Sequence, residues 1–166
     1  KQVYNDRGSR GTKNVSVWKP VIDDNEGYCL GYHVKEGHGR PVQDLLIGLK
    51  NAPKYAFVQP VDFKLEWHQA RGNQSLWCWI PIPPTGYKAV GFIGTTNRNK
   101  PNADVIRCVA TKYVNQIPVQ ERIWIDRGTG GPDGSFWSLG NGIACISGGT
   151  HSKPNRTLYA PKDEYM

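Results

Sequence analysis

Hydrophobic and polar residues alternate with a period of two over several short stretches, which are separated by turns rich in glycine and proline. The stretch 61–67 (VDFKLEW) alternates in this way. So does 113–124, where Pro118 marks a bulge or a strand break because proline has no backbone N–H to donate. A further short strand is expected at 55–58. The pattern predicts an all-β domain.

A triplet of the form aromatic–x–polar, followed by a glycine-bearing loop, occurs three times. The copies are Tyr4-Asn5-Asp6 with Gly8 and Ser9, Trp67-His68-Gln69 with Gly72, and Trp124-Ile125-Asp126 with Gly128 and Thr129. Each loop runs into a strand that carries a tryptophan, at Trp18, Trp79 and Trp137, and the two intervals are nearly equal. This self-similarity indicates three repeats within one domain, about 1–52, 53–111 and 112–166.

A turn and a short strand follow each tryptophan strand. We expect these strands at 29–32, 89–92 and 145–148, which would make Cys29 and Cys145 equivalent. Units of a few short strands cannot bury their own hydrophobic faces, so they are expected to pack around a common axis. The predicted fold is a β-prism of three pseudo-threefold-related repeats, each a short, mostly antiparallel sheet. The segment through Asp6 is expected to pair beside the segment near Tyr159, so that the termini close one sheet.

The composition agrees with one folded domain of 166 residues. Six Trp, eight Tyr and four Phe supply enough apolar surface to exclude disorder. No apolar run reaches the length of about 18 residues that a membrane-spanning helix needs. The net charge of +7 is spread along the chain without a block of like charges, so we predict no nucleic-acid partner.

The cysteines are Cys29, Cys78, Cys108 and Cys145, and none forms a C-x-x-C pair. Zinc-ribbon and redox motifs are therefore absent, while three intrachain disulfide pairings, intersubunit disulfides or buried free thiols remain open. N-glycosylation sequons occur at Asn14, Asn73 and Asn155, and the chain begins at Lys1, as after removal of a signal peptide. These features predict a secreted, extracellular protein.

The triplets and loops carry the groups that a sugar-binding site needs. Asp6 and Asp126 supply charged hydrogen-bond acceptors, with Gln69 in the equivalent position. Gly8, Gly72 and Gly128 permit close backbone approach, and Ser9 and Thr129 add hydroxyl groups. The candidate aromatic stacking faces are Tyr4, Trp18, Trp67, Trp124 and Trp137. The alternative is structural: the aspartates cap their own turns, and the aromatic side chains fill the core.

The remaining polar residues give no catalytic pattern. His33 and His38 lack a partner that would complete a metal site, and His151 stands alone in a polar loop. His68 could replace the missing acidic group of the second triplet as a donor. No nucleophile elbow, metalloprotease motif, P-loop or glycosidase carboxylate pair is present. We predict a protein that is not an enzyme and uses no metal or cofactor.

The run Trp-x-Asp-x-Gly-Ser/Thr, followed by Phe/Val-Trp and a Gly-Tyr turn, resembles a β-prism repeat family. That family occurs in vacuolar-sorting-related proteins and in targeting domains of some pore-forming insecticidal toxins. The chain looks most like the jacalin-related lectins of the pearl-oyster mantle, over 4–162. The lectin resemblance implies binding of α-glucosides such as trehalose and regulation of calcium carbonate biomineralisation. It also implies a homodimer or a heterodimer of isoforms, with disulfide linkage as one form.

Two alternatives belong to other functional classes. The toxin and sorting relatives suggest a module that targets membranes, with the basic loops 35–40 and 98–100 against anionic headgroups. A mineral or matrix protein that binds through net charge alone is the second alternative.

Overall fold

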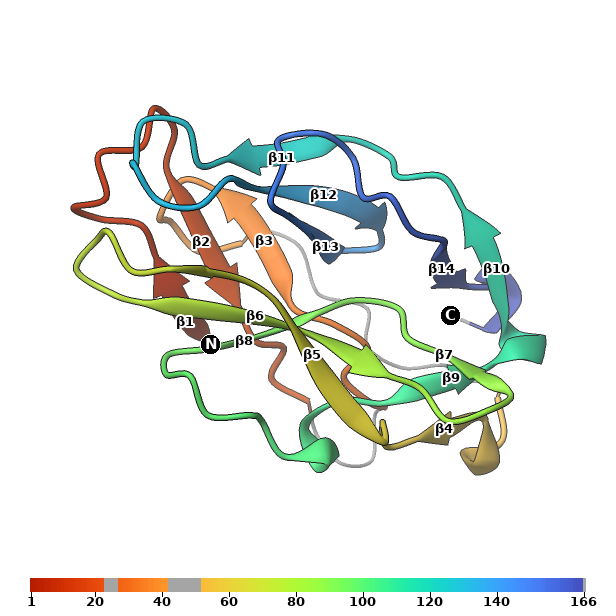
Figure 1. Ribbon diagram of the computed structural model, residues 1–166. Helices are drawn as coiled ribbons and strands as arrows, with labels where there is room; N and C mark the ends of the chain where they lie inside the picture. The colour runs from red at the N-terminus through yellow and green to blue at the C-terminus, as the bar shows by residue number, and fades with distance from the viewer. Residues whose placement is uncertain (23–26, 42–51, 166) are drawn as a thin grey trace.

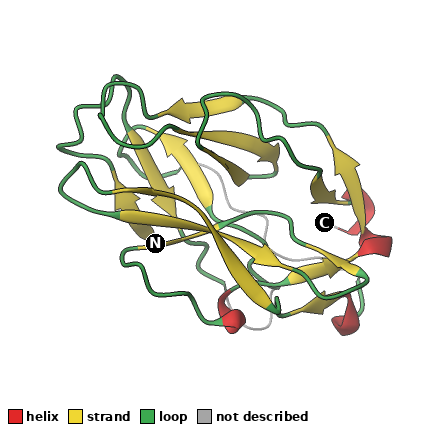
Figure 2. Ribbon diagram, in the orientation of Figure 1, coloured by secondary structure: helices red, strands yellow, loops and turns green. Residues whose placement is uncertain are grey.

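The computed structural model describes residues 1–22, 27–41 and 52–165, so the end of the first expected repeat, 42–51, lies outside the described residues. In the described parts, short strands alternate with turns and 3-10 segments, and no α-helix occurs (Figure 2). None of these residues forms a helix long and apolar enough to cross a membrane. The predicted all-β class is confirmed.

Three antiparallel sheets of three strands form the body of the protein (Figure 1). They are β1 (Gln2–Asn5), β2 (Val15–Trp18) and β3 (His33–Glu36); β5 (Asp62–Gln69), β6 (Leu76–Ile82) and β8 (Ile93–Thr95); and β11 (Arg122–Ile125), β12 (Gly134–Gly140) and β13 (Ile143–Gly148). In each sheet the strand of the aromatic–x–polar triplet lies at an edge, and the tryptophan strand lies in the centre. The arrangement is that of a β-prism.

Shorter strands lie at the end of the molecule where the C-terminus is found, on the right in Figure 1. They are β4 (Phe57–Val58), β9 (Cys108–Ala110) and β7 (Tyr87–Lys88) in one sheet, and β10 (Val114–Ile117) with β14 (Leu158–Pro161) in another. The 3-10 segments are η1 (Lys54–Ala56), η2 (Ala103–Val105), η3 (Thr111–Tyr113) and η4 (Asp163–Tyr165). Pro118 separates β10 from β11, as expected.

Closure of the fold differs from the sequence expectation. The C-terminal strand β14 pairs with β10, whereas the N-terminal strand β1 pairs with β2, so the termini do not share a sheet. The short strand of the first two repeats also begins four residues later than expected, at His33 and Ile93. Trp18 pairs with His33, Trp79 with Ile93 and Trp137 with Cys145. Cys145 is therefore equivalent to His33 rather than to Cys29.

Gly31, Gly91 and Ile143, each two residues before the partner of the tryptophan, meet on the pseudo-threefold axis. A Cβ added to Gly91 would lie 2.8 Å from both the Cα of Gly31 and the Cγ2 of Ile143. The two glycines thus leave room for one isoleucine side chain, which fills the centre. Backbone hydrogen bonds join the repeats here: Gly91 donates to Leu30, and Ala144 to Tyr32.

All four cysteines are free and buried, so the structure contains no intrachain disulfide. Of the possibilities left open by the sequence, the structure has buried free thiols. Burial raises the pKa of Cys29 and Cys145 from 9.0 to about 11 and that of Cys108 to about 12, and it raises the pKa of Cys78 well above 9.0.

We expect the native protein to react very slowly with a thiol-specific reagent such as Ellman's reagent at pH 8, because the thiols are buried and protonated. In denaturant, the four cysteines of each chain should all react rapidly with the reagent. Since thiolates favour the unfolded chain, the free energy of unfolding should hold below pH 9 and fall as the pH rises towards 11. Fast native labelling of any thiol would contradict the structure.

Candidate functional site at the loop end of the prism

The loops that follow the three triplets gather at one end of the molecule, on the left in Figure 1. We call this surface the loop end; it comprises residues 6–14, 70–75 and 126–133. Each loop is bonded to the other two. The amide of Asn73 donates to the carbonyl of Arg7 at 2.8 Å, and the amide of Thr12 donates to the carbonyl of Arg127 at 2.9 Å.

The third link of this ring is a side-chain contact. The amide nitrogen of Gln69 donates to the Thr129 hydroxyl at 3.0 Å. Gly72 is needed for the contact between the first two loops, because a Cβ there would lie 2.6 Å from the carbonyl oxygen of Arg7. Of the predicted glycine and hydroxyl positions, Gly72 and Thr129 therefore hold the loops to one another, whereas the Ser9 hydroxyl accepts from the amide of Gly11 within its own loop.

The carboxylates of Asp6 and Asp126 are buried beneath the loops. Asp6 accepts a hydrogen bond from the amide of Val15, and Asp126 accepts one from the amide of Gly134, each at 3.0 Å. These bonds close the two loops, as the turn-capping alternative expects.

Each of these aspartates also has a histidine partner that the sequence did not suggest. Nε2 of His38 lies 2.6 Å from Oδ1 of Asp6, and Nε2 of His151 lies 2.6 Å from Oδ1 of Asp126. The signal was available in the repeats: a histidine follows the third strand in the two repeats that have Asp, and Arg98 stands there in the repeat that has Gln69. His38 and His151 are thus partners of the triplets rather than isolated surface residues.

The aromatic residues of the triplets form the centre of the core. Tyr4, Trp67 and Trp124 are almost completely buried, and the two indoles pack edge-on with ring centroids 6.1 Å apart. Trp67 donates to the carbonyl of Pro132, and Trp124 donates to that of Lys13, so each indole fixes a loop of the next repeat. A stacking role for these three rings would require the core to open.

The tryptophans of the central strands lie nearer the surface. Trp18 and Trp137 are half-buried, and their indole N–H groups donate to the buried hydroxyls of Ser16 and Ser135 at 2.9 Å. Trp79 is buried, and its N–H donates to Thr95 instead. Of the candidate stacking faces, Trp18 and Trp137 retain some open surface.

The exposed charge of the loop end is mainly positive. Its exposed cations are Arg7, Arg10, Lys13, Arg71 and Arg127. Of the three acidic residues in these loops, Asp6 and Asp126 are buried against histidines, and Asp133 is exposed. The basic loops named from the sequence are less available, because Lys35 donates to the carbonyls of Gly39 and Arg40 and Lys100 pairs with Asp62 at 2.8 Å.

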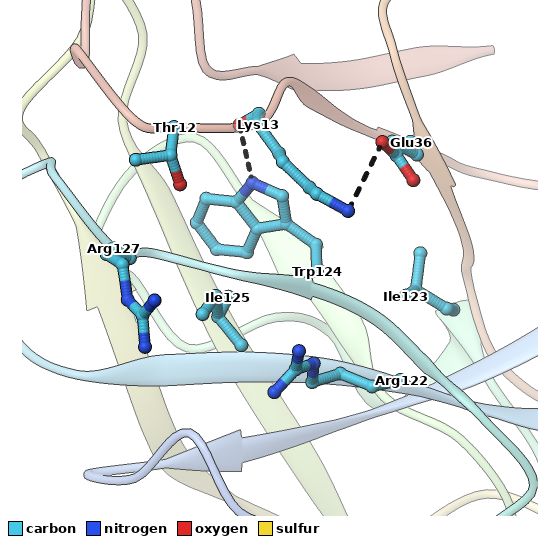
Figure 3. Close-up of a pocket in the computed structure, with 8 residues that line it drawn as sticks. All are labelled: Thr12, Lys13, Glu36, Arg122, Ile123, Trp124, Ile125 and Arg127. Atoms are coloured by element: carbon cyan, nitrogen blue, oxygen red, sulfur yellow. Dashed lines mark hydrogen bonds and ion pairs between the residues drawn. The ribbon is translucent and has the colours of Figure 1, made fainter.

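A shallow pocket of about 210 Å³ continues this basic surface between the first and third repeats (Figure 3). Its charged lining residues are Lys13, Glu36, Arg122 and Arg127. Lys13 lies 3.9 Å from Glu36, but neither arginine side chain has a hydrogen-bond or ion-pair partner among the described residues. The pocket therefore offers two unpaired guanidinium groups, which suit anionic oxygen ligands.

The structure predicts that Asp126→Ala lowers the free energy of unfolding by about 2–4 kcal/mol, because it leaves the Gly134 amide and His151 without their partner. Urea denaturation measures this loss. Asp133→Ala is the matched control, since that side chain is 63% exposed; its effect should stay within about 0.5 kcal/mol. Equal stability of the two variants would show that the Asp126 carboxylate does not hold the loop.

Comparison with known proteins places the fold. The structure of GNIP1Aa from Chromobacterium piscinae is similar, with a TM-score of 0.78 and 22% identity over 98% of this chain. The chain spans about a third of that protein, 35% of its length. No curated protein matches the chain. The family model of vacuolar protein sorting-associated protein 62 (Vps62) matches residues 1–134, which include the first two repeats and the start of the third. The chain therefore belongs to the Vps62 family.

Proposed function

We propose that this protein is a non-enzymatic β-prism targeting module that binds anionic membrane surfaces through its loop end. The observation that carries the proposal is the set of five exposed cations on three mutually bonded loops, whose carboxylates are largely buried. Membership of a vacuolar-sorting family agrees with a role at membranes. The membrane-targeting alternative thus becomes the main proposal. The basic surface proposed to contact the membrane is now the loop end rather than the loops 35–40 and 98–100.

The loops are suited to contact at the headgroup level rather than insertion. They consist of glycine, small polar residues and cations, and none of the exposed large hydrophobic residues lies in them. Each Lys or Arg near an anionic leaflet contributes about 1 kcal/mol, so several together give useful affinity. Because the loops bond one another, the backbone that carries the cations is held in place before binding, which lowers the entropy lost on association.

Other features support binding rather than catalysis and location outside the cell. The cysteine thiols are buried and have raised pKa values, so they are poor nucleophiles. Asn14, Asn73 and Asn155 are all exposed, as acceptor sites for glycans must be. Secretion remains part of the proposal.

The direct test is co-sedimentation with vesicles of phosphatidylcholine that do or do not contain phosphatidylserine. Binding should require phosphatidylserine and disappear at high salt. The triple variant Arg7→Gln, Arg71→Gln, Arg127→Gln should weaken partitioning roughly a hundredfold, since it removes three contacts of about 1 kcal/mol each.

The charge-matched control removes three cations that lie beside the shorter strands, with Lys54→Gln in η1, Lys112→Gln in η3 and Lys162→Gln directly after β14. It should bind vesicles nearly as well as the unmodified protein. Equal losses in both triple variants would mean that net charge acts without a site, as in the mineral-matrix alternative.

Glycan binding is a second candidate, and one observation favours it. On the outer side of the second sheet, exposed His68 lies parallel to half-buried Trp77, with an interplanar angle of 11° and ring centroids 5.9 Å apart. The other repeats have serine at the position of Trp77, namely Ser16 and Ser135. A flat aromatic pair beside the Gln69 loop could stack against the C–H face of a sugar ring. The likeness to pearl-oyster lectins, trehalose binding, dimerisation and biomineralisation stay predictions under this candidate.

A glycan array with trehalose, isomaltose and maltose as competitors tests this candidate. Trp77→Ala should reduce any α-glucoside binding at least tenfold, whereas Tyr55→Ala, which removes an exposed aromatic residue at the far end, should not. A blank array, or binding that Trp77→Ala leaves intact, would remove the aromatic pair as a sugar site.

A further inference from the structure

Three metal-ligating side chains of the third repeat converge at one point of the loop end. They are Asp126 at the end of the β11 strand, Asp133 just before β12, and His151 in the loop after β13. One ligand atom of each lies within 4.8 Å of the other two. Nε2 of His151 is 2.6 Å from Oδ1 of Asp126 and 3.7 Å from Oδ1 of Asp133.

The first repeat shows which part of this cluster the fold itself needs. It has the same aspartate–histidine pair, Asp6 and His38, but Asn14 stands where the third repeat has Asp133. In both repeats this residue accepts a hydrogen bond through its backbone carbonyl, from Gly37 to Asn14 and from Gly149 to Asp133. The loop is therefore closed without a second carboxylate.

The Asp133 carboxylate thus lies beside His151 without a structural task. Its distance of 3.7 Å from Nε2 is too long for a hydrogen bond, and its side chain is 63% exposed, so it is free to move inward. Asp126 is by contrast held by the amide of Gly134 and the hydroxyl of Thr129. The cluster therefore offers a metal ion one fixed carboxylate, one histidine and one carboxylate that can adjust its position.

This donor set is typical of zinc. Zn²⁺ takes imidazole nitrogen and carboxylate oxygen at about 2.0–2.2 Å, so tetrahedral ligand atoms lie roughly 3.4 Å apart. The distance of 3.7 Å between His151 and Asp133 is close to this value, whereas the 2.6 Å hydrogen bond between His151 and Asp126 has to open and release its proton when the ion binds. Calcium and magnesium prefer sets of oxygen ligands alone. The hydrogen bonds to Asp126 are the outer contacts that orient a metal ligand.

We propose that Asp126, Asp133 and His151 form a zinc site in the third repeat, with the remaining coordination position open to water or to an anionic ligand. The first repeat carries an incomplete copy of this site, which lacks only the second carboxylate. No motif in the sequence indicates a metal here, because His151 lies 25 positions after Asp126 along the chain. The site is independent of membrane binding and is tested without lipid.

The experiment is a zinc titration of the untagged full chain against a chromophoric chelator, which reports both affinity and stoichiometry. The unmodified protein should bind one Zn²⁺. Asp133→Asn should weaken binding at least tenfold and leave the melting temperature of the metal-free protein unchanged, because Asn is the natural residue in the first repeat.

The reciprocal variant completes the first repeat. Asn14→Asp should raise the stoichiometry from one to two, with Asp6 and His38 as the other ligands. Calcium and magnesium should not compete. No saturable zinc binding, zinc binding that Asp133→Asn leaves intact, or a stoichiometry of one in Asn14→Asp would each overturn the proposal.

Discussion

The contact that the rest of the fold depends on is the meeting of three repeats at Gly31, Gly91 and Ile143. Three identical residues could not satisfy this point: three glycines would leave a cavity, and three isoleucines would overlap. With two glycines and one isoleucine, a single side chain fills the space on the axis. The backbone bonds between neighbouring repeats then set how each sheet is rotated about the axis. That rotation brings all three loops to the same end of the prism, where they bond in a ring.

Beneath the loop ring lies a polar layer whose residues must match in pairs. A buried carboxylate is costly unless charge and hydrogen bonds compensate it, and Asp6 and Asp126 each obtain an amide and a histidine. Gln69 carries no charge and therefore needs no histidine. Its amide instead accepts from the Arg71 amide and donates to Thr129, which links the second loop to the third. The departure of the second repeat from the pattern is thus a change in how the loops are joined.

The sequence predicted the fold class, the three repeats and the break at Pro118, because these follow from alternation, spacing and proline chemistry. It misplaced the short strands of the first two repeats. The apolar stretches around Gly31 and Gly91 were assigned to these strands, but both glycines lie in the axial contact that precedes them. The pairing of the termini was wrong because partners in a sheet are set by the rotation of the repeats, which no local pattern encodes. The contacts of Asp6 with His38 and Asp126 with His151 join residues 32 and 25 positions apart. Only comparison among the repeats could have suggested them.

Where the first and third triplets end, a buried residue is followed directly by an exposed one. Asp6 and Asp126 are buried, and the residues that follow them, Arg7 and Arg127, are exposed. The buried member of each pair is fully engaged by the chain. The exposed member bonds through its backbone: the carbonyls of Arg7 and Arg127 accept from the amides of Asn73 and Thr12, and the amide of Arg7 donates to Asn5. Its guanidinium group therefore contributes nothing to holding the loops. Because the fold does not require exposed arginines at these positions, they are the residues to which the proposed membrane binding is assigned. The repeated motif then forms the scaffold, and under this proposal the exposed residues that follow it determine what the loop end binds.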